Sequence, residues 1–401
     1  MKTTGIIAEY NPFHNGHKYH LEQARQITGC DYVIVVMSGD YTQRGTPAIY
    51  SKFMRAKAAL LAGADLVLEM PVYGSVSSAP DFAECGVNTL DSTDICDYLF
   101  FGSESGDIDL LKQQAATLSD ESEEISAKIK AGLKAGLSWP EARANAYGDH
   151  DPIASTPNDI LGIEYIHAIQ KCESAILPVT MKRNDPGYHS DEKEGRFASA
   201  TAARKAILAN DLDFIQEVLP DEHFESLTDY VCPPITFDDC SLLLSEKLLT
   251  SSMDQLLQTA GMPNDLARKL FKHRMEFLSS DQLVAERKNR NYTYTRVNRS
   301  LLNLMLGITK DDASQFKEHD SVPWLRILGF RKEAAPLLSE LKKCSTVPII
   351  TKTANAGSIL SDEAFGLFQK HLTASERYRL IAQLKSGKTI KNEFTSSIII
   401  V

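Results

Sequence analysis

Apolar runs that alternate with helical segments are the feature that most constrains the fold of this chain. Four of them begin at Thr3, Tyr32, Asp65 and Tyr98, and a further run covers 175–181. The second reads Tyr-Val-Ile-Val-Val-Met without a polar interruption, which is typical of a strand covered on both faces. A helical pattern from 51 to 62 separates it from the third run, which stops at Pro71. This alternation predicts an α/β fold with an open parallel sheet of Rossmann type, whose ligands bind at the carboxyl ends of the strands.

The length of the chain predicts more than one domain. With 401 residues, 43% of them apolar, the chain exceeds what a single compact core usually holds. We place the sheet domain at 1–210, with a helical insertion at about 107–147 that is rich in Ala, Lys, Glu and Ser. Residues 211–401 are expected to form a mainly α-helical second domain.

Composition predicts a cytoplasmic protein without a membrane partner. No stretch approaches the roughly 18 uninterrupted apolar residues of a membrane span, and the first residues lack the basic start and apolar core of a signal peptide. The seven cysteines are scattered and never form a Cys-x-x-Cys pair, which indicates reduced thiols. Because the sequence contains no His-x-x-x-His or His-x-His pair, we expect no protein-bound metal site.

A His-x-Gly-His turn follows the first apolar run. His14-Asn15-Gly16-His17 combines two imidazoles, three residues apart at the start of a helix, with a glycine that lets a phosphate approach the backbone. Two such imidazoles can stabilise a pentacoordinate phosphorus without acting as nucleophiles. His14 and His17 are therefore our candidate catalytic residues for chemistry at a nucleotide phosphate.

Two later helix starts are candidates for the same site. Ser199 can cap the helix that follows it, and together with the Thr201 hydroxyl and Arg204 it would form a second phosphate cradle. The pattern Ser-x-Thr-x-x-Arg is weak alone, but it follows a strand and turn that would close the sheet begun by the His-x-Gly-His strand. Asn158 also begins a helix, where it would serve either as a cap or as a ligand contact.

One segment of this acidic chain is basic. The net charge is −10, yet the segment 268–299 holds nine Lys and Arg against three Asp and Glu, a local balance of +6. Two tyrosines interleave with these positive charges, which suits contacts to phosphates and bases of single-stranded or looped RNA. A solvated helical face would explain the charges equally well. The candidate RNA-binding residues are Arg287, Lys288, Arg290, Tyr292, Tyr294, Arg296 and Arg299.

The motifs together resemble the HIGH-superfamily nucleotidyltransferases, a HUP-type fold, and within them the tRNA(Met) cytidine acetate ligase family. The resemblance is carried by ordered blocks at residues 5–17, 37–45, 62–71, 101–104, 157–162 and 187–189, and by a later stretch at 292–299. It implies that 1–210 is a nucleotidyltransferase-like domain and that 211–401 binds tRNA. It also implies activation of acetate by ATP to acetyl-adenylate, followed by acetyl transfer to N4 of the wobble cytidine of elongator methionine tRNA.

The resemblance extends the candidate ATP site beyond the two histidines. Its ATP-binding loop matches Ile7, Ala8, Glu9, Tyr10, Asn11, Pro12, Phe13, His14, Asn15, Gly16, His17, Lys18, Tyr19 and His20. Further nucleotide contacts match Gly102, Asn158 and Arg183, which we combine with Ser199, Thr201 and Arg204.

Two positions depart from the pattern of that family. Asp40 stands where an asparagine is usual after Ser-Gly, and Asp159 stands where a second asparagine is usual after the proline. Each adds a carboxylate near the expected polyphosphate, so we expect these groups either to reach a magnesium ion that accompanies ATP or to point away.

Two other functions stay open from the sequence. A small-molecule adenylyl- or cytidylyltransferase, acting on a pantetheine phosphate or on nicotinate mononucleotide, would need no basic extension of this length. A non-catalytic RNA-binding protein would tolerate loss of His14 or His17, and both are present.

Overall fold

A mostly parallel sheet forms the centre of the molecule. The computed structural model describes residues 1–119, 123–134, 142, 145–146, 156–183, 198–228, 233–276, 278–288, 292–318 and 322–401. The strands are β1 (Thr3–Ala8), β2 (Tyr32–Ser38), β3 (Leu66–Met70), β4 (Tyr98–Ser103), β5 (Leu177–Lys182), β6 (Leu325–Phe330), β7 (Ile349–Ile350) and β8 (Ile399–Ile400). In the described chain their order is β5-β4-β1-β2-β3-β6-β7, and β8 pairs with β6. All pairs are parallel except β3 with β6, so the predicted α/β class with an open parallel sheet is confirmed.

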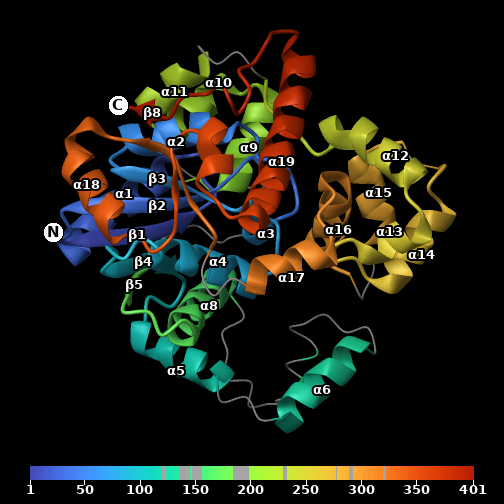
Figure 1. The fold of residues 1–401 in the computed structure, drawn as a ribbon, viewed down its shortest axis with the longest axis horizontal. Helices are drawn as coiled ribbons and strands as arrows, with labels where there is room; N and C mark the ends of the chain where they lie inside the picture. The colour runs from blue at the N-terminus through green and yellow to red at the C-terminus, as the bar shows by residue number, and fades with distance from the viewer. Residues whose placement is uncertain are drawn as a thin grey trace.

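Helices surround this sheet and form a separate group beside it (Figure 1). The helices of the first half are α1 (Asn15–Thr28), α2 (Lys52–Leu61), α3 (Val72–Ser75), α4 (Ala79–Asp91), α5 (Ile108–Ser119), α6 (Glu123–Lys134) and α8 (Pro157–Lys171). Those of the second half are α9 (Ala200–Ala209), α10 (Leu212–Val218), α11 (Asp221–Thr228), α12 (Ser241–Thr250), α13 (Met253–Gln258), α14 (Asn264–Lys272), α15 (Ser280–Arg287), α16 (Tyr294–Leu306), α17 (Lys310–Glu318), α18 (Ala335–Cys344) and α19 (Asp362–Ser386). Short 3₁₀ helices lie at Asp238–Cys240, Lys332–Ala334 and Thr353–Ser358.

The sheet is buried on both faces, as its continuous apolar runs predict. Val33 and Val35 of β2 pack on one side with the buried residues of α1 and α2. Ile34 and Val36, the alternate residues of the same strand, pack on the other side with those of α4 and α8. Successive side chains of a strand point to opposite faces, so a strand with helices on both sides is apolar throughout.

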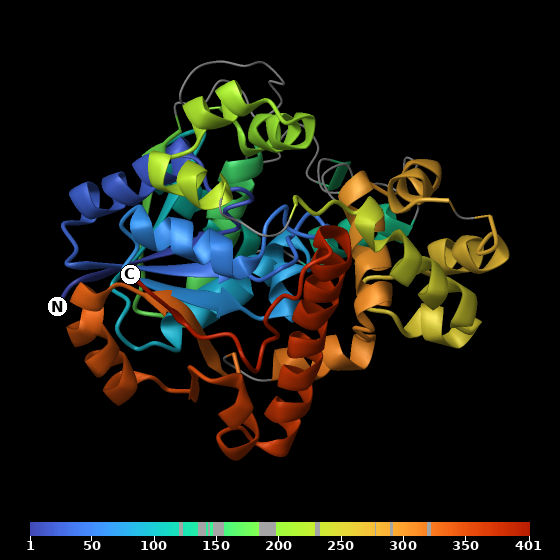
Figure 2. The same ribbon diagram turned by 90° about the horizontal axis from the view of Figure 1, so that it is seen from above.

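The C-terminal part of the chain returns to the sheet. It is mainly helical, as expected, but β6 pairs antiparallel with β3, and β7 and β8 pair parallel with β6. None of these strands was predicted: β7 and β8, with two residues each, are too short to show an alternation of apolar and polar residues, and the six-residue β6 was assigned to the mainly helical second domain. In the sequence, the helices α12–α16 therefore come between two segments that belong to the sheet. In space, α19 lies between the sheet and α16 (Figure 2).

The expected insertion contributes two helices, α5 and α6, and its remaining residues lie largely outside the described ones. Within the part of the chain that the structure describes, no helix has the length and apolar character needed to cross a membrane.

Candidate nucleotide site

A pocket opens where β1 and β4 end. β1 lies between β2 and β4, so the helices that follow these strands leave toward opposite faces, and ligands of Rossmann-like sheets bind at such a switch point. The cavity has a volume of about 460 Å³ and is formed by the loop after β1, the ends of β4 and β5, and the starts of α1, α8 and α9. We call it the switch-point pocket. Its position is the one that the sequence predicts for the His-x-Gly-His turn.

His14 and His17 start helix α1 and line this pocket. The Nδ1 atom of His14 accepts a hydrogen bond from the amide of Gly16 at 3.1 Å, and Nδ1 of His17 accepts one from the amide of His14 at 3.2 Å. The two rings stack with centroids 3.7 Å apart. Because each Nδ1 acts as an acceptor, the proton of each neutral imidazole resides on Nε2. The capping pattern thus fixes both tautomers and leaves two N–H donors for a ligand.

Burial keeps these imidazoles neutral. It lowers the pKa of His14 to about 3, with further lowering by the nearby charges of Arg183, Arg204 and His223. Burial and the charge of His14 hold the pKa of His17 well below its usual value. At neutral pH the pair therefore offers hydrogen bonds to phosphate oxygens without carrying charge, and positive charge must come from elsewhere.

The predicted second cradle supplies that charge. Arg204 of α9 donates from Nη1 to the carbonyl of Asn11 at 2.6 Å and from Nη2 to the Thr201 hydroxyl at 3.1 Å. Ser199 caps α9 by accepting a hydrogen bond from the Ala202 amide at 3.2 Å. Ser199, Thr201 and Arg204 all line the switch-point pocket, so the fold brings the two cradles together across a gap of more than 180 residues in the sequence.

Asn158 is a pocket residue and not a helix cap. Thr156 occupies the N-cap position of α8, without a capping hydrogen bond from its side chain, and the Asn158 side chain donates to Oε1 of Glu104 at 2.8 Å. Glu104 also accepts the amides of Asn158 and Asp159, at 3.2 and 2.8 Å, so its carboxylate positions the start of α8. Sequence reasoning missed this role, although Glu104 directly follows β4, where site residues are expected.

Gly102 makes room for an arginine. A Cβ atom at this position would lie 2.9 Å from Cγ of Arg183, so any larger residue would displace that side chain. Arg183 lines the pocket and approaches Oδ1 of Asn158 with Nη1 at 3.5 Å. Gly102, which we expect to contact the nucleotide, thus also leaves space for the Arg183 side chain to pass over the end of β4.

The two unusual carboxylates point away from the pocket. Asp40 accepts a hydrogen bond from the Lys52 amide at 2.9 Å, and Asp159 accepts both the amide and the hydroxyl of Ser105 at 3.1 Å. Neither side chain lines the switch-point pocket. Of the two expectations for Asp40 and Asp159, the geometry agrees with the second.

The pocket lining differs from the predicted set at a few positions. Pro12, Phe13, Asn15 and Lys18 do not line it; Phe13 is fully buried in the core, and Asn15 donates to the carbonyl of Glu217 at 2.9 Å. Residues that the sequence did not single out also line it: Ile6, Gln43, Arg44, Phe82, Phe101, Leu161, Tyr165, Met181, Ala198 and Ala200. Of these residues, Arg44 could have been identified from the sequence, since it follows β2 and lies in the block 37–45 that resembles the family.

The candidate RNA-binding residues lie on α15, α16 and the segment between them. Lys288 and Arg296 are exposed, Arg287 and Arg299 are half-buried, and Arg290 lies outside the described residues. Tyr294 is 41% exposed, whereas Tyr292 is only 8% exposed and donates its hydroxyl to Asp265. The Arg296 guanidinium lies 5.2 Å from the Tyr292 ring. The Tyr292 ring thus packs near the exposed Arg296 guanidinium on α16 and is not itself open for stacking with a base.

A parallel sheet whose first strand leads into a neutral histidine pair, faced by arginines from later elements, defines a HIGH-type nucleotidyltransferase. A family model described as HIGH Nucleotidyl Transferase matches residues 1–393. The tRNA(Met) cytidine acetate ligase of Acetivibrio thermocellus is 34% identical, with 100% of both chains covered, and that of Caldanaerobacter subterraneus subsp. tengcongensis is 38% identical, with 95% of both covered. The crystal structure of Thermotoga maritima TmcAL bound with α-thio ATP matches with a TM-score of 0.91 at 30% identity, over 100% of both chains.

The chain therefore belongs to the tRNA(Met) cytidine acetate ligase family, within the HIGH nucleotidyltransferases. It is an enzyme of the ligase class.

Proposed function

We propose that this enzyme activates acetate with ATP and acetylates N4 of the wobble cytidine of elongator methionine tRNA in the cytoplasm. The observation that carries the proposal is the pair of Nε2–H donors of His14 and His17 in the switch-point pocket, opposite Arg183 and Arg204. The Acetivibrio and Caldanaerobacter relatives are named tRNA(Met) cytidine acetate ligase, and the structurally similar Thermotoga protein is bound with α-thio ATP.

In the first step, an acetate oxygen attacks the α-phosphorus of ATP. The bond from that oxygen to phosphorus forms, the bond from phosphorus to the bridging oxygen breaks, and pyrophosphate leaves. His14 and His17 would donate to the phosphate oxygens as negative charge builds up on them, while Arg183 and Arg204 would hold the departing pyrophosphate. No side chain needs to act as a nucleophile, which agrees with a pocket whose histidines are neutral donors.

In the second step, the cytosine N4 amine attacks the acetyl carbon of acetyl-adenylate. The carbon–nitrogen bond forms, the bond to the AMP oxygen breaks, and the amine proton is lost as AMP leaves. The target base must leave its stack to reach the anhydride. The basic segment of α15 and α16 supports this step because it offers phosphate contacts beside the ATP domain.

Magnesium would be held mainly by ATP itself. Among the described residues, no group of three or more His, Cys, Asp or Glu side chains converges on a metal position. Glu9 is a carboxylate that does line the switch-point pocket, and Mg²⁺ commonly takes one carboxylate together with phosphate oxygens and water. Glu9 is therefore the residue that would fit such an ion.

The two alternatives from the sequence are disfavoured. A small-molecule adenylyl- or cytidylyltransferase does not account for full-length relatives that are named tRNA(Met) cytidine acetate ligase. A non-catalytic RNA-binding protein would not need to keep both histidine tautomers aligned on one cavity.

His17→Ala tests the proposal. Acetate-dependent exchange of labelled pyrophosphate into ATP should fall by about 100-fold or more, because one donor to the transition-state phosphate is lost. Labelled acetate should appear in methionine tRNA only when ATP, acetate and tRNA are all present. The tRNA affinity of the variant should stay within about twofold of the wild type, because electrostatic contacts far from His17 dominate it.

His167→Gln is the matched control. His167 lies on α8, is half-buried and does not line the pocket, so its loss should leave the exchange rate unchanged. Acetylation of tRNA in the absence of ATP, or normal exchange by the His17→Ala enzyme, would refute the proposed chemistry.

A further inference from the structure

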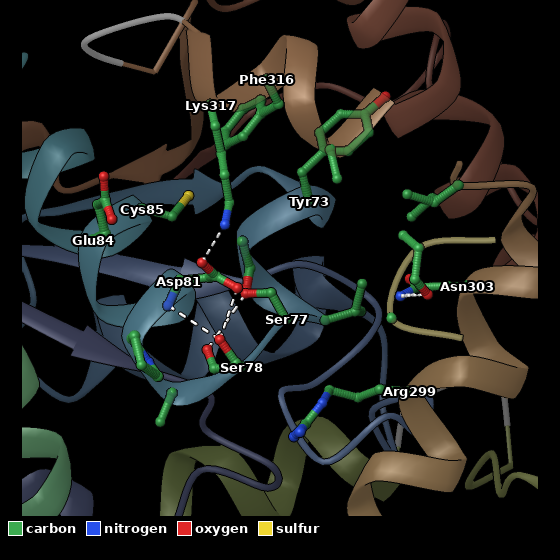
Figure 3. A pocket seen from close by; sticks show the side chains of 18 of the residues that line it. Tyr73, Ser77, Ser78, Asp81, Glu84, Cys85, Arg299, Asn303, Phe316 and Lys317 are labelled. Carbon is green, nitrogen blue, oxygen red and sulfur yellow. Dashed lines mark hydrogen bonds and ion pairs between the residues drawn. The ribbon is translucent and has the colours of Figure 1, made fainter. Parts of the chain in front are cut away.

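A second, larger cavity lies between the sheet domain and the helical group. It has a volume of about 890 Å³ and is bounded by α3 and α4 on one side and by α16 and α17 on the other (Figure 3). We call it the α4–α16 cavity. Ligand sites for small organic groups span about 300–1,000 Å³, so this volume suits a nucleotide. Nothing in the proposed chemistry of the switch-point pocket uses it.

The two cavities share walls. Glu84 of α4 and Ile160 of α8 line the α4–α16 cavity, whereas Phe82 and Leu161, on the same two helices, line the switch-point pocket. A polymer that inserts one group into the switch-point pocket therefore has the α4–α16 cavity within reach of a neighbouring group.

One helix presents a polar row to this cavity. Arg296, Arg299 and Asn303 of α16 all line it, at spacings of three and four residues that place them on one helix face. In Figure 3 Arg299 and Asn303 lie across the cavity from Asp81 and Glu84. The row thus faces the sheet domain and not the solvent side of the helical group.

The cavity has a positive end. Three carboxylates line the cavity, and each has a basic side chain beside it: Asp81 pairs with Lys317 at 2.5 Å, Glu84 with Lys171 at 2.8 Å, and Glu164 lies 3.9 Å from Nδ1 of His167. Arg296 and Arg299 form no ion pair with any residue that the structure describes, although Arg299 donates to the carbonyl of Gln43 at 3.2 Å. Asp81 is the nearby carboxylate whose charge acts on Arg299, but neither guanidinium is in ion-pair contact with a described residue, and two such groups suit a phosphodiester.

Asn303 offers a buried acceptor. Its side chain is 6% exposed, and Nδ2 donates to the carbonyl of Ala260 at 3.1 Å, which fixes the orientation of the amide. Oδ1 then has no hydrogen-bond partner within the described chain. A buried acceptor without a hydrogen-bond donor costs folding free energy. A ligand N–H, such as those on the edges of nucleobases, would supply the missing donor to this oxygen.

We propose that the α4–α16 cavity binds an unstacked nucleotide of the tRNA anticodon loop, adjacent to the cytidine that is acetylated. Arg296 and Arg299 would hold its phosphate, Asn303 would accept from its base edge, and apolar side chains such as Val76 and Ile308 would cover the ring. The inference rests on the proposed function and extends it, because it assigns a recognition site separate from the acetylation site.

A filled cavity and a missing base should have the same effect. Ser314 is an exposed residue of α17 that lines the cavity, so Ser314→Trp fills the space without disturbing a core. The affinity of the wild-type enzyme is measured for an anticodon stem-loop RNA and for versions lacking one loop base each. We expect one abasic position beside the target cytidine to weaken binding about tenfold. Ser314→Trp should weaken binding of the intact RNA to a similar extent. With that abasic RNA, the substitution should cause no further loss of affinity.

Three controls separate the outcomes. Ser339→Trp, an exposed serine on α18, should bind every RNA as the wild type does. Ser314→Trp should keep wild-type ATP affinity, which also reports that it is folded. Arg296→Gln, an independent change in the same cavity, should weaken intact RNA several-fold and reduce the salt slope of binding by about one.

The inference is overturned if Ser314→Trp binds the intact RNA with wild-type affinity. It is also overturned if the substitution and the missing base, combined, reduce the affinity by the product of their separate effects. Competition by free nucleoside monophosphates at the same affinity as RNA would instead assign the cavity to a small nucleotide and equally overturn it. Failure of the wild type to bind any stem-loop would sink the proposed tRNA substrate as well, whereas normal acetylation by Ser314→Trp would remove this inference alone.

Discussion

At the scale of single residues, buried charges organise the loops around the nucleotide pocket. Arg55 of α2 is fully buried, and its guanidinium donates to the carbonyls of Glu9, Ser38, Gly39 and Tyr50. It thereby ties the loop after β1 to the loop after β2. In the sequence Arg55 looks like an exposed position on a helix, because its acceptors are backbone groups that only the tertiary fold brings together. Sequence reasoning therefore identified the groups that would touch the nucleotide more readily than those that hold the loops.

The low pKa of His14 predicts a pH-dependent stability. Its folded-state pKa is about 3 against an ordinary value of 6.5, so the unfolded chain takes up this proton first as the pH falls. The stabilisation is complete above pH 6.5 and declines toward pH 3, with a loss of about 2 kcal/mol between pH 7 and pH 5 for this one group. His14→Asn keeps a good helix cap and removes the titration.

Urea unfolding of both proteins at pH 7 and pH 5 checks this prediction. The free energy of unfolding should fall by about 2 kcal/mol less in His14→Asn than in the wild type. Equal losses in the two proteins would mean that His14 is not held neutral by the fold.

At the scale of elements, the strands with long apolar runs were predictable and the short ones were not. β2 and β3 lie where the β-branched run after Tyr32 and the run ending before Pro71 placed them. β7 and β8, by contrast, take their place from the exposed edge of β6 and not from their own two-residue sequences. The His-x-Gly-His turn was recognisable because its four residues are consecutive in the sequence. The contact between the loop 42–46 and α16 was not recognisable, since its hydrogen bonds join residues 254 and 256 positions apart.

That contact predicts a special role for Gly45. Its φ of +77° suits glycine, and a Cβ atom would lie 2.4 Å from the backbone nitrogen of Arg299. Gly45→Ala should push the loop off α16, lower stability by about 1–3 kcal/mol and weaken tRNA binding more than ATP binding. Separate titrations with ATP and with the anticodon stem-loop measure the two effects.

Gly63→Ala is the matched control for backbone strain. Gly63 also has a positive φ, +112°, but no atom lies within 4 Å of its would-be Cβ. The prediction fails if the two variants lose stability equally and bind the stem-loop alike.

At the scale of the whole molecule, a buried ion network joins the first and last parts of the chain. Lys52 of α2 pairs with Glu69 of β3 at 2.8 Å and with Glu393 at 2.9 Å. Arg326 of β6 pairs with the same two carboxylates, at 3.0 and 2.6 Å. Because all four side chains are at least nine-tenths buried, the network requires the antiparallel pairing of β3 and β6 to be intact.

Lys52→Met should therefore be strongly destabilising. Lys52 also lies 3.9 Å from Asp40, so its loss leaves three buried carboxylates to Arg326 and to His371, which is 3.4 Å from Glu69, and this costs about 3–5 kcal/mol. Lys128→Met is the control, since Lys128 pairs with Glu124 at 2.8 Å on an exposed helix surface and should change stability by less than about 0.5 kcal/mol. Denaturant unfolding of both variants checks the difference, and a small effect at Lys52 would mean that the network does not anchor the C-terminal strands.

The return of β6 and β8 to the sheet also sets an order of events during synthesis on the ribosome. β3 ends at residue 70, but its neighbour β6 begins at 325 and β8 at 399, so the sheet stays incomplete until most of the chain has been translated. The helices α12–α16 contact mainly one another, so this group can form once α16 has emerged. A nascent chain paused inside this helical group would therefore present the unpaired edge of β3 to chaperones or to other nascent chains.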